Sequence, residues 1–381
     1  MVLQKWDKSA TVSCGASDIG GWVSFHLEIF NGEYNPYIWT CTAVWAFDRV
    51  LRYGRILAIN RVATKSTGRY IEGANLIKVT VPIRGIIRPQ PGTYYYIYMM
   101  GGLKIWECHP FTLSSWESGA LNKGSSTQLT FMFRVFNGFT RRVHDRLTVD
   151  GQIESDLEKF NKPIRLVIEG PYGHTHNLSG YTSVLFIVGG LGVTVALSHL
   201  QSLLESAARN KNMRTRRIHV VWSVREERLL KEVYEQDLAQ WQNPGTTRNF
   251  GLRLDAYLTN DTAVCSSQRR HISPIPTPNN NSPADKEMVS DEKVHGLSRT
   301  SDILPNGTLP SASFHKNIFH HRPRIHDIVY DVVEACAMPQ ENLAVVSCGP
   351  GAFSDDVRDA VAKALGRGYN DLDFYPETFT W

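Results

Sequence analysis

An imidazole, a proline, an aromatic ring and three hydroxyl groups stand within eight residues, between His109 and Trp116. Such a ring binds a flat ligand by its face, and hydroxyls donate hydrogen bonds to ring and phosphate oxygens. The stretch follows a β-rich run, so it suits a strand that holds a flavin. A strand followed by a serine-rich turn accounts for the same residues. The candidate flavin-binding residues are His109, Pro110, Phe111, Thr112, Ser114 and Ser115.

A second candidate site lies where the continuous apolar run 184–188 meets a glycine turn and a helical pattern over 196–208. Strand, glycine turn and helix together place a pyrophosphate on free N–H groups at the helix N-terminus. Val195 stands where the third glycine of the generic dinucleotide fingerprint would be, so that fingerprint is absent. The candidate phosphate-binding residues are Gly189, Gly190, Gly192 and Thr194.

Two further strands end in residues that suit a dinucleotide. Ser223 and Arg225 follow the buried run 218–222, and a hydroxyl with an arginine at the end of a parallel strand favours NADPH over NADH. The alternative is that Arg225 pairs with Glu226 or Glu227 on a surface helix. The strand predicted over 342–347 runs into Cys348, Gly349 and Pro350, and a helix is expected over 355–365. Cys348 is either part of the dinucleotide site or a buried structural thiol.

The order of these patterns predicts an α+β protein of two domains. Several short β-type runs between Asn75 and Ile168 alternate with turn signals and indicate an antiparallel β-barrel. After Gly170 and Gly173 the pattern becomes that of a Rossmann-like α/β domain. We place the barrel at 61–174 and the α/β domain at 175–381. Residues from about 261 to 316 contain few large apolar side chains, and we expect a disordered insertion there.

Composition limits the class of function. A net charge of +4, from 41 basic and 37 acidic residues, is too balanced to indicate a nucleic-acid binder. The six cysteines are scattered without metal-ligand spacing, so we expect no metal site and reduced thiols in a cytosol-like compartment. The first residues lack the apolar stretch of a secretory signal.

Residues 1–60 contain a segment with features of a membrane edge. The uncharged run 34–47 is 14 residues long, shorter than the roughly 20 that span a bilayer. Arg49, Arg52 and Arg55 follow at intervals of three residues among apolar ones. This pattern predicts a basic amphipathic helix at a lipid surface, with an ordinary solvated helix as the alternative.

Six short motifs resemble those of the ferric reductase and NADPH oxidase superfamily, most closely the fungal ferric-chelate reductases. His109 to Ser115 resembles its HPFT-x-x-S flavin motif, and the turn before Tyr94 resembles P-G-Q-Y with Thr93 in place of glutamine. Gly138 and Thr140 resemble its second flavin element. Residues 189–194 resemble the G-G-x-G-[IV]-T turn of the ferredoxin-reductase type. The C-G-P triplet at Cys348 and the ending from Glu377 to Trp381 resemble the remaining two.

The resemblance implies FAD and NADPH as cofactors. It places Cys348 beside the nicotinamide and Trp381 over the flavin, which makes these two the catalytic candidates. It implies that FAD contacts the residues of the flavin motif and the barrel glycines, and that NADPH contacts the ends of the parallel strands. The residues that it adds to the cofactor sites are Gly138, Thr140, Gly170, Gly173, Cys348, Gly349 and Pro350.

The resemblance also implies a reaction and a place. Electrons would pass from NADPH through FAD to a ferric chelate or to haem, at the cytosolic face of a membrane and in the service of iron uptake. The family's earlier helices, which hold haem through paired histidines, have no counterpart here, and His26 lacks an upstream partner at helical spacing. The chain therefore resembles the dehydrogenase portion of such a protein, with a remnant of the membrane region at 1–60. The dehydrogenase module of an NADPH oxidase and a non-catalytic membrane-associated module are the alternatives.

Overall fold

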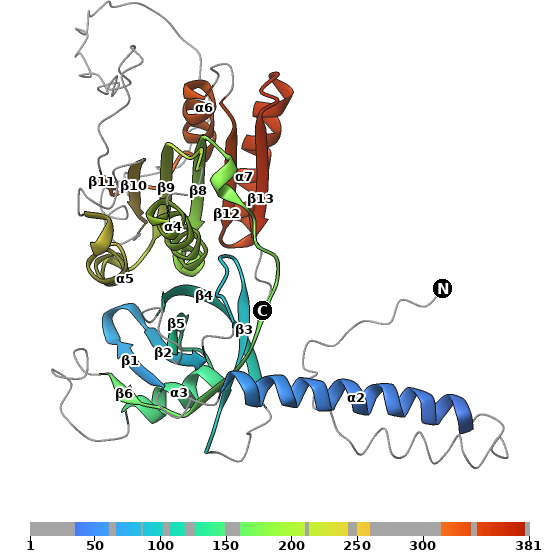
Figure 1. Ribbon diagram of the computed structural model, residues 1–381. Helices are drawn as coiled ribbons and strands as arrows, with labels where there is room; N and C mark the ends of the chain where they lie inside the picture. The colour runs from blue at the N-terminus through green and yellow to red at the C-terminus, as the bar shows by residue number, and fades with distance from the viewer. Residues whose placement is uncertain are drawn as a thin grey trace, which may run out of the picture.

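The computed structural model describes residues 35–60, 66–84, 87–101, 107–118, 126–148, 161–209, 213–242, 250–259, 314–336 and 341–377. Within these ranges it shows two domains and a long helix that projects from the first of them (Figure 1). His26, most of the predicted insertion, Phe379 and Trp381 lie outside the described residues.

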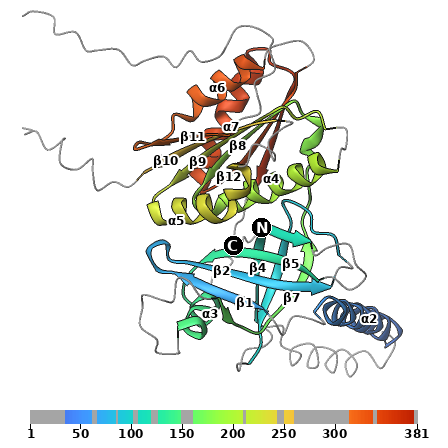
Figure 2. The same ribbon diagram turned by 60° about the vertical axis from the view of Figure 1, so that its left-hand side comes forward.

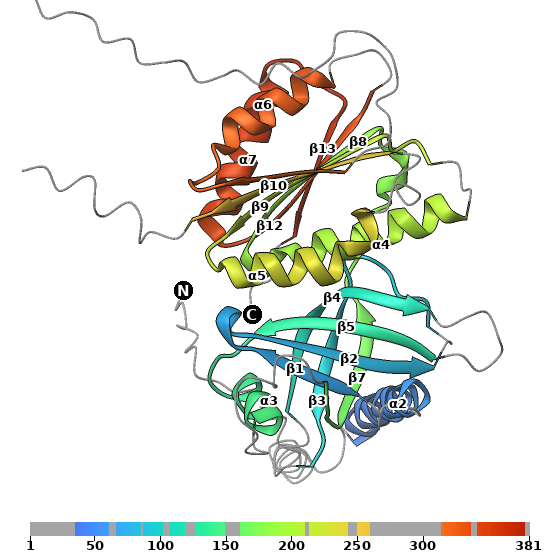
Figure 3. The ribbon, with the colours of Figure 1, turned by 90° about the vertical axis from the view of Figure 1, so that its left-hand side faces the viewer.

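The first domain is a curled antiparallel sheet, as the sequence predicts. Its strands are β1 (Thr67–Ile71), β2 (Leu76–Arg84), β3 (Tyr94–Met99), β4 (Cys108–Ser118), β5 (Ser126–Arg134), β6 (Lys162–Pro163) and β7 (Leu166–Tyr172), in the order β6-β1-β2-β5-β4-β3-β7. A short 3₁₀ turn, η2 (Glu72–Ala74), joins β1 to β2, and helix α3 (Phe139–Thr148) follows β5. The strands enclose one apolar core (Figure 3).

Alternation of side chains produces this core. Ile77, Val79 and Val81 of β2 are fully buried, and their neighbours Lys78 and Thr80 are only partly buried. Tyr95 and Ile97 of β3 repeat the pattern. A period of two residues places every second side chain on the inner face of a strand. The sequence pattern does not predict strand β1, because this strand is short and contains few apolar residues.

Helix α2 (Asn35–Ile59) has 25 residues and projects from the barrel beyond β7 (Figures 1 and 3). Arg52 donates two hydrogen bonds to the Glu169 carboxylate and one to the Tyr98 hydroxyl. Arg55 lies over the Tyr172 ring. These two arginines therefore contact the barrel, which the amphipathic pattern alone does not predict. Among the helices of the described ranges, none combines the length and apolarity needed to cross a bilayer.

The second domain is a parallel sheet with helices on both faces. In chain order it comprises η3 (Leu178–Gly180), β8 (Ser183–Gly189), η4 (Gly190–Gly192), α4 (Val193–Ala208), β9 (Arg217–Val224), α5 (Glu227–Glu232), the π-helical turn η5 (Val233–Asp237), η6 (Ala239–Gln242), β10 (Gly251–Leu258), β11 (Phe314–Phe319), α6 (Ile325–Ala335), β12 (Leu343–Cys348), α7 (Gly351–Gly366) and β13 (Leu372–Glu377). The strand order is β11-β10-β9-β8-β12-β13. The predicted Rossmann-like class is confirmed.

Strand β11 begins inside the segment predicted as an insertion. Its residues Phe314, His315 and Lys316 pair with β10 in parallel register. The strand lies at the sheet edge, and the polar side chains among its apolar ones conceal it in the sequence. The α/β domain therefore resumes at Phe314.

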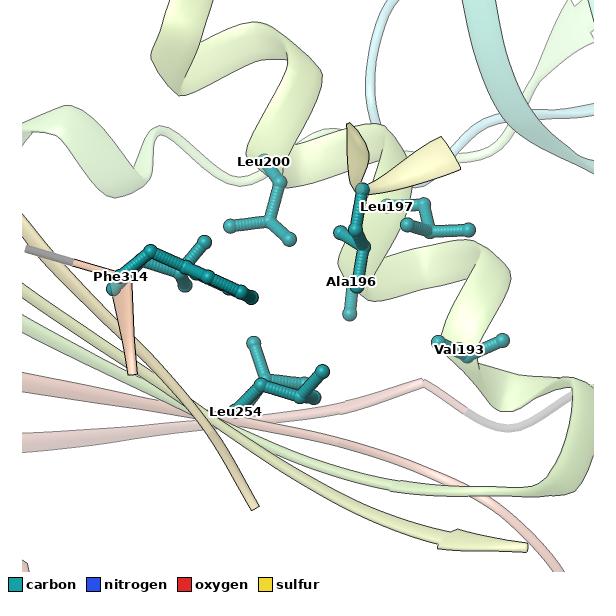
Figure 4. A pocket seen from close by; sticks show the side chains of 9 residues that line it. Val193, Ala196, Leu197, Leu200, Leu254 and Phe314 are labelled. Atoms are coloured by element: carbon teal, nitrogen blue, oxygen red, sulfur yellow. The ribbon is translucent and has the colours of Figure 1, made fainter. Parts of the chain in front are cut away.

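Helices α4 and α5 cover the face of the sheet that looks toward the barrel, and α6 and α7 cover the other face (Figures 2 and 3). Under α4 the apolar core leaves a cavity of about 10 Å³, between the helix and strands β9 and β10. Val193, Ala196, Leu200, Leu254 and Phe314 are among its lining residues (Figure 4). The side chains that line this cavity are apolar and offer a water molecule no hydrogen-bond partner.

Oppositely charged side chains join the two domains. The barrel contributes cations and the α/β domain contributes carboxylates, in the pairs Arg69–Glu232, Lys78–Asp237 and Arg134–Glu226. Lys78 Nζ lies 2.7 Å from Asp237 Oδ1, with 14% and 7% of the two side chains exposed. Trp116 of β4 adds a hydrogen bond to Glu205 of α4. We call this interdomain surface the seam.

Candidate functional site

The glycine turn at the carboxyl end of β8 is built by close backbone contacts. A Cβ on Gly192 would lie 2.3 Å from the carbonyl oxygen of Cys348, and one on Gly189 would lie 3.1 Å from Pro350. Gly190 has φ +55°, a conformation that side chains disfavour. Its carbonyl accepts a hydrogen bond of 2.9 Å from the Trp222 indole. The turn is therefore rigid and admits no larger residue at position 192.

This turn leads directly into α4, a helix of 16 residues. The N-cap residue, Gly192, provides no side-chain hydrogen bond to the first turn. Thr194 is buried, and its hydroxyl donates to the Leu191 carbonyl at 2.9 Å, so it holds the turn from within. Because uncapped N–H groups at a helix start bind phosphate oxygens, the residues present fit a pyrophosphate.

Cys348 ends β12 beside this turn. In the sheet it stands opposite Val188 on one side and Glu377 on the other. Only 3% of the residue is exposed, and burial raises the pKa of its thiol to about 12. The thiol therefore stays protonated at neutral pH and is no nucleophile. A Cβ on Gly349 would meet the Phe353 ring, and Pro350 is the N-cap of α7. The triplet of Cys348, Gly349 and Pro350 thus packs against the glycine turn.

Ser223 and Arg225 lie at the carboxyl end of β9, next to the carboxyl end of β8 where the glycine turn begins. Ser223 pairs in register with Gly189, so its half-buried side chain is next to the turn. Arg225 is exposed. The alternative pair of Arg225 with Glu226 or Glu227 is not among the ion pairs of the described residues, and both oxygens of Glu226 accept hydrogen bonds from Arg134 at 2.8 Å.

Arg134 was missed by sequence reasoning. It ends β5 in the barrel, and its guanidinium lies 4.0 Å from the position that a Cβ of Gly190 would take. A cation there is well placed to meet a dinucleotide phosphate. A lone arginine at a strand end gives no signal in the sequence, because its importance comes from the other domain.

On the barrel side, β4 presents the predicted flavin residues along one strand. Phe111 packs on Phe133 with ring centroids 4.3 Å apart. Pro110 and Thr112 are half-buried and stand opposite Tyr96 and Tyr94 of β3. Ser114 is fully buried, and its hydroxyl has no hydrogen-bond partner within the described part of the chain. A buried hydroxyl normally has a partner, so this strand fits a ligand that supplies one. Ser115 follows at a break in the β4–β5 register.

His109 and the start of α3 hold local partners instead. About half of the His109 side chain is exposed, and its Nε2 lies 3.1 Å from Glu107 Oε1. Arg142 of α3 contacts the other oxygen of Glu107 and lowers the pKa of that carboxyl. The Thr140 hydroxyl bonds both the amide and the carbonyl of Phe136, which closes the turn around Gly138.

The remaining barrel glycines pack against tyrosines. A Cβ on Gly170 would lie 2.4 Å from the Tyr95 ring, and Gly173, at φ +94°, faces Tyr94. Both positions exclude side chains for reasons of packing. Whether either contacts a cofactor stays a prediction.

The turn that carries Gly92 brings the two half-sites together. Leu113 of β4 donates to the Thr93 carbonyl at 3.0 Å, and the Gly92 amide donates to Ser198 of α4 at 3.3 Å. The Glu377 carboxylate at the end of β13 lies against Gly92 as well. The flavin strand, the glycine turn with its helix, and the end of β13 thus converge at the seam. The fold and this double site define an FAD- and nicotinamide-binding protein of the ferredoxin-reductase type.

Comparison with known proteins gives the narrower class. The FAD-binding domain family matches residues 61–176, and the ferric reductase NAD binding domain family matches residues 181–362. The chain is 27% identical to ferric reductase transmembrane component 3 of Saccharomyces cerevisiae, over 91% of its own length and 43% of that protein. It is 30% identical to a probable cell surface ferric reductase of Aspergillus oryzae, over 53% of its length and 26% of that protein.

A ferredoxin-NADP⁺ reductase from Plasmodium falciparum is similar in structure at 13% identity, with a TM-score of 0.43, over 84% of this chain and 99% of that one. The two family matches show that the chain carries an FAD-binding domain followed by a ferric reductase NAD binding domain. The chain spans less than half the length of the Saccharomyces relative.

Proposed function

We propose that this chain passes electrons from NADPH through FAD to a metal acceptor, as the dehydrogenase portion of a ferric-chelate reductase. The observation that carries the proposal is the convergence at Gly92. The turn of Gly92 and Thr93 bonds to strand β4, whose buried Ser114 hydroxyl has no partner among the described residues, and to helix α4, whose N-terminus has no side-chain cap. FAD, when bound, takes two electrons from NADPH together and releases them singly.

Within this proposal the chain's own residues bind and orient. Phe111, Thr112 and Ser114 would hold the flavin ring, and His109 with the α3 start would hold its pyrophosphate. The glycine turn would hold the NADPH pyrophosphate, and Ser223 and Arg225 its 2′-phosphate. Cys348, as a neutral buried thiol, would shape the nicotinamide pocket. Trp381 as the aromatic cover of the flavin stays an expectation.

The direct test is flavin binding and turnover by the purified chain. We expect a yellow protein that retains FAD and reduces a ferric chelate with NADPH as electron donor. NADH should support lower turnover, and Arg225→Ala should reduce the preference for NADPH. A colourless protein that does not respond to added FAD would exclude the proposal and favour the non-catalytic module. Oxygen consumption without chelate reduction would favour the NADPH oxidase alternative.

We further propose that α2 lies at a membrane, with the two domains on its cytosolic side, where the enzyme would serve iron uptake. Large apolar side chains along α2 are exposed, among them Trp39 at 62% and Trp45 at 49%. Contiguous exposed apolar surface on a helix marks an interaction site. The relatives named as transmembrane components support lipid as the partner. Electrons would then pass to a ferric chelate or to a haem.

Vesicle flotation tests this placement. We expect the chain to float with anionic phospholipid vesicles, and Trp39→Ser with Trp45→Ser to abolish flotation. Leu365→Ser is the matched control, because Leu365 is 41% exposed but lies on α7 of the other domain. Equal flotation of the two variants would argue against α2 as the membrane contact.

A further inference from the structure

Two rows of side chains connect the predicted flavin strand to helix α2. In the first row, Tyr94 of β3 stands opposite Thr112 of β4 on one side and Tyr172 of β7 on the other. Residues that stand opposite one another in a sheet place their side chains on the same face. This is the outer face of the barrel, because the next residue, Tyr95, is buried in the core. The Arg55 guanidinium of α2 lies 5.4 Å from the centroid of the Tyr172 ring and completes the row.

The second row runs beside the first on the same strands. Tyr96 stands opposite Pro110 of β4 and opposite Glu169 of β7. Arg52 Nε and Nη2 donate hydrogen bonds of 2.7 and 2.8 Å to the two oxygens of the Glu169 carboxylate. An arginine that donates to both oxygens of a carboxylate has one favoured orientation. This pair therefore fixes the rotation of α2 as well as its distance from β7.

Glu169 is the centre of the second row. Only 1% of its side chain is exposed. The hydroxyls of Tyr98 and Tyr172 donate to it at 2.7 and 2.5 Å, in addition to Arg52. Burial acts to raise the pKa of this carboxyl, but the hydrogen bonds from Arg52, Tyr172 and Tyr98 outweigh burial and lower the pKa. The carboxylate is therefore charged at neutral pH, and it depends on a cation that α2 supplies.

Asn60 ties the end of α2 to the same strand. Its Nδ2 donates to the Ile168 carbonyl at 2.6 Å, and its Oδ1 accepts from the Ile168 amide at 2.8 Å. Ile59, the last residue of the helix, is 4% exposed and belongs to the barrel core. We call the contacts of Arg52, Arg55 and Asn60 with β7 the α2 joint. The joint leaves the helix little freedom to change its angle to the barrel.

We propose that Arg52 and Arg55 are positioning residues for the flavin, which set the angle between its ring and α2 through Glu169 and Tyr172. The inference rests on the proposed function, in which the flavin ring lies against β4 and α2 lies at a membrane. The α2 joint then gives the ring one fixed inclination to the lipid surface. Because the rate of an enzymatic step depends on the geometry in which the reactants are held, this inclination sets how well the ring meets an acceptor at that surface.

Linear dichroism of the bound flavin tests this orientation directly. The full chain with FAD is bound to anionic phospholipid vesicles aligned by flow, and the dichroism of the visible flavin band is expressed per vesicle-bound FAD. We expect a clear signal in the wild type and a loss of about two thirds of it in Arg55→Met, which interrupts the first row. Arg49→Met is the matched control. It should keep the wild-type signal, because Arg49 pairs with Asp48 of the same helix.

The second row needs a variant that leaves no buried charge unpaired. Arg52→Met alone deprives the Glu169 carboxylate of its cation, so it is combined with Glu169→Gln. The double variant should bind FAD and keep the KM for NADPH, yet lose the dichroism, which separates positioning from folding. A wild-type signal in the double variant, a signal near zero in the wild type, or equal losses in Arg49→Met and Arg55→Met would overturn the proposal.

Hydrogen exchange tests the α2 joint without flavin or lipid. In the chain alone, Arg52→Met with Glu169→Gln should make the amides of β7 and of the last turns of α2 exchange about tenfold faster than in the wild type. Arg49→Met should leave their exchange unchanged. Equal exchange in all three proteins would overturn the joint. A chain that shows the joint but retains no FAD would refute the proposed function and leave the joint in place.

Discussion

The glycine turn of the α/β domain and strand β4 of the barrel face the same seam but are held by different forces. Backbone atoms and buried side chains fix the turn, with Trp222 on Gly190 and Cys348 against Gly192. On the barrel side, His109 and Arg142 are both engaged with Glu107. Under the proposed function, a phosphate at the turn would meet backbone N–H groups, whereas on the barrel it would compete with the Glu107 carboxylate. We therefore expect the turn to be preformed and the barrel site to exchange partners when the cofactor binds.

The largest expected effect comes from breaking the seam on which both sites depend. Lys78→Met leaves Asp237 buried without its cation, and burial already raises the pKa of that carboxyl. We expect a loss of about 3–5 kcal/mol in the free energy of unfolding, measured by urea denaturation. Lys363→Met is the control, because Lys363 and Asp359 form an exposed pair whose loss should leave the free energy of unfolding nearly unchanged. Equal losses would mean that the seam pair is no more than a surface contact.

The preformed turn is tested by a single methyl group. Gly192→Ala places a Cβ within 2.3 Å of the Cys348 carbonyl oxygen, and the backbone has to move. We expect roughly a hundredfold loss of NADPH-dependent turnover, because small displacements of a binding element are costly. In Gly180→Ala the new methyl group meets nothing within 4 Å, and turnover should be unchanged. Normal NADPH turnover in Gly192→Ala would refute the rigid turn.

The exchange on the barrel side is tested at Glu107. Glu107→Gln removes the negative charge that holds Arg142 and His109. We expect FAD to bind about fivefold more tightly, equivalent to about 1 kcal/mol, because these pairs are partly exposed. Fluorescence titration of the chain with FAD measures the Kd. Weaker binding would mean that Glu107 orients these side chains for the ligand instead of competing with it.

The smallest expected effect concerns the cavity under α4. Val193→Ile adds one methylene at the lining of this cavity of about 10 Å³, close to the glycine turn. We expect a gain of about 0.5 kcal/mol in the free energy of unfolding, with unchanged turnover. Thermal denaturation measures it. A loss of stability would show that the core around the turn has no room for even this addition.

The parallel sheet was the easier half to predict. Continuous apolar runs such as 184–188 are buried on both faces, and they stand out in the sequence. The sequence pattern predicts the start of α4 too late, at Ala196, whereas the helix begins at Val193, directly after the turn. Strand β11 was missed, because an edge strand needs few apolar side chains.

The candidate site was predictable where chemistry depends on short motifs and unpredictable where it depends on pairing between domains. Gly192 and Cys348 are 156 positions apart in the sequence and adjacent in the fold. Arg134 carries no motif, and its partner Glu226 lies in the other domain. Local periodicity contains no information about such contacts.

The Arg52–Glu169 pair has a practical consequence for anyone who wishes to shorten this protein. Glu169 is 1% exposed and receives hydrogen bonds from Arg52, Tyr98 and Tyr172. A shortened protein that begins after Ile59 would keep the Glu169 carboxylate but lose Arg52. We expect its free energy of unfolding to fall by several kcal/mol. Replacing Glu169 with glutamine at the same time would remove the buried charge that the loss of Arg52 leaves unpaired.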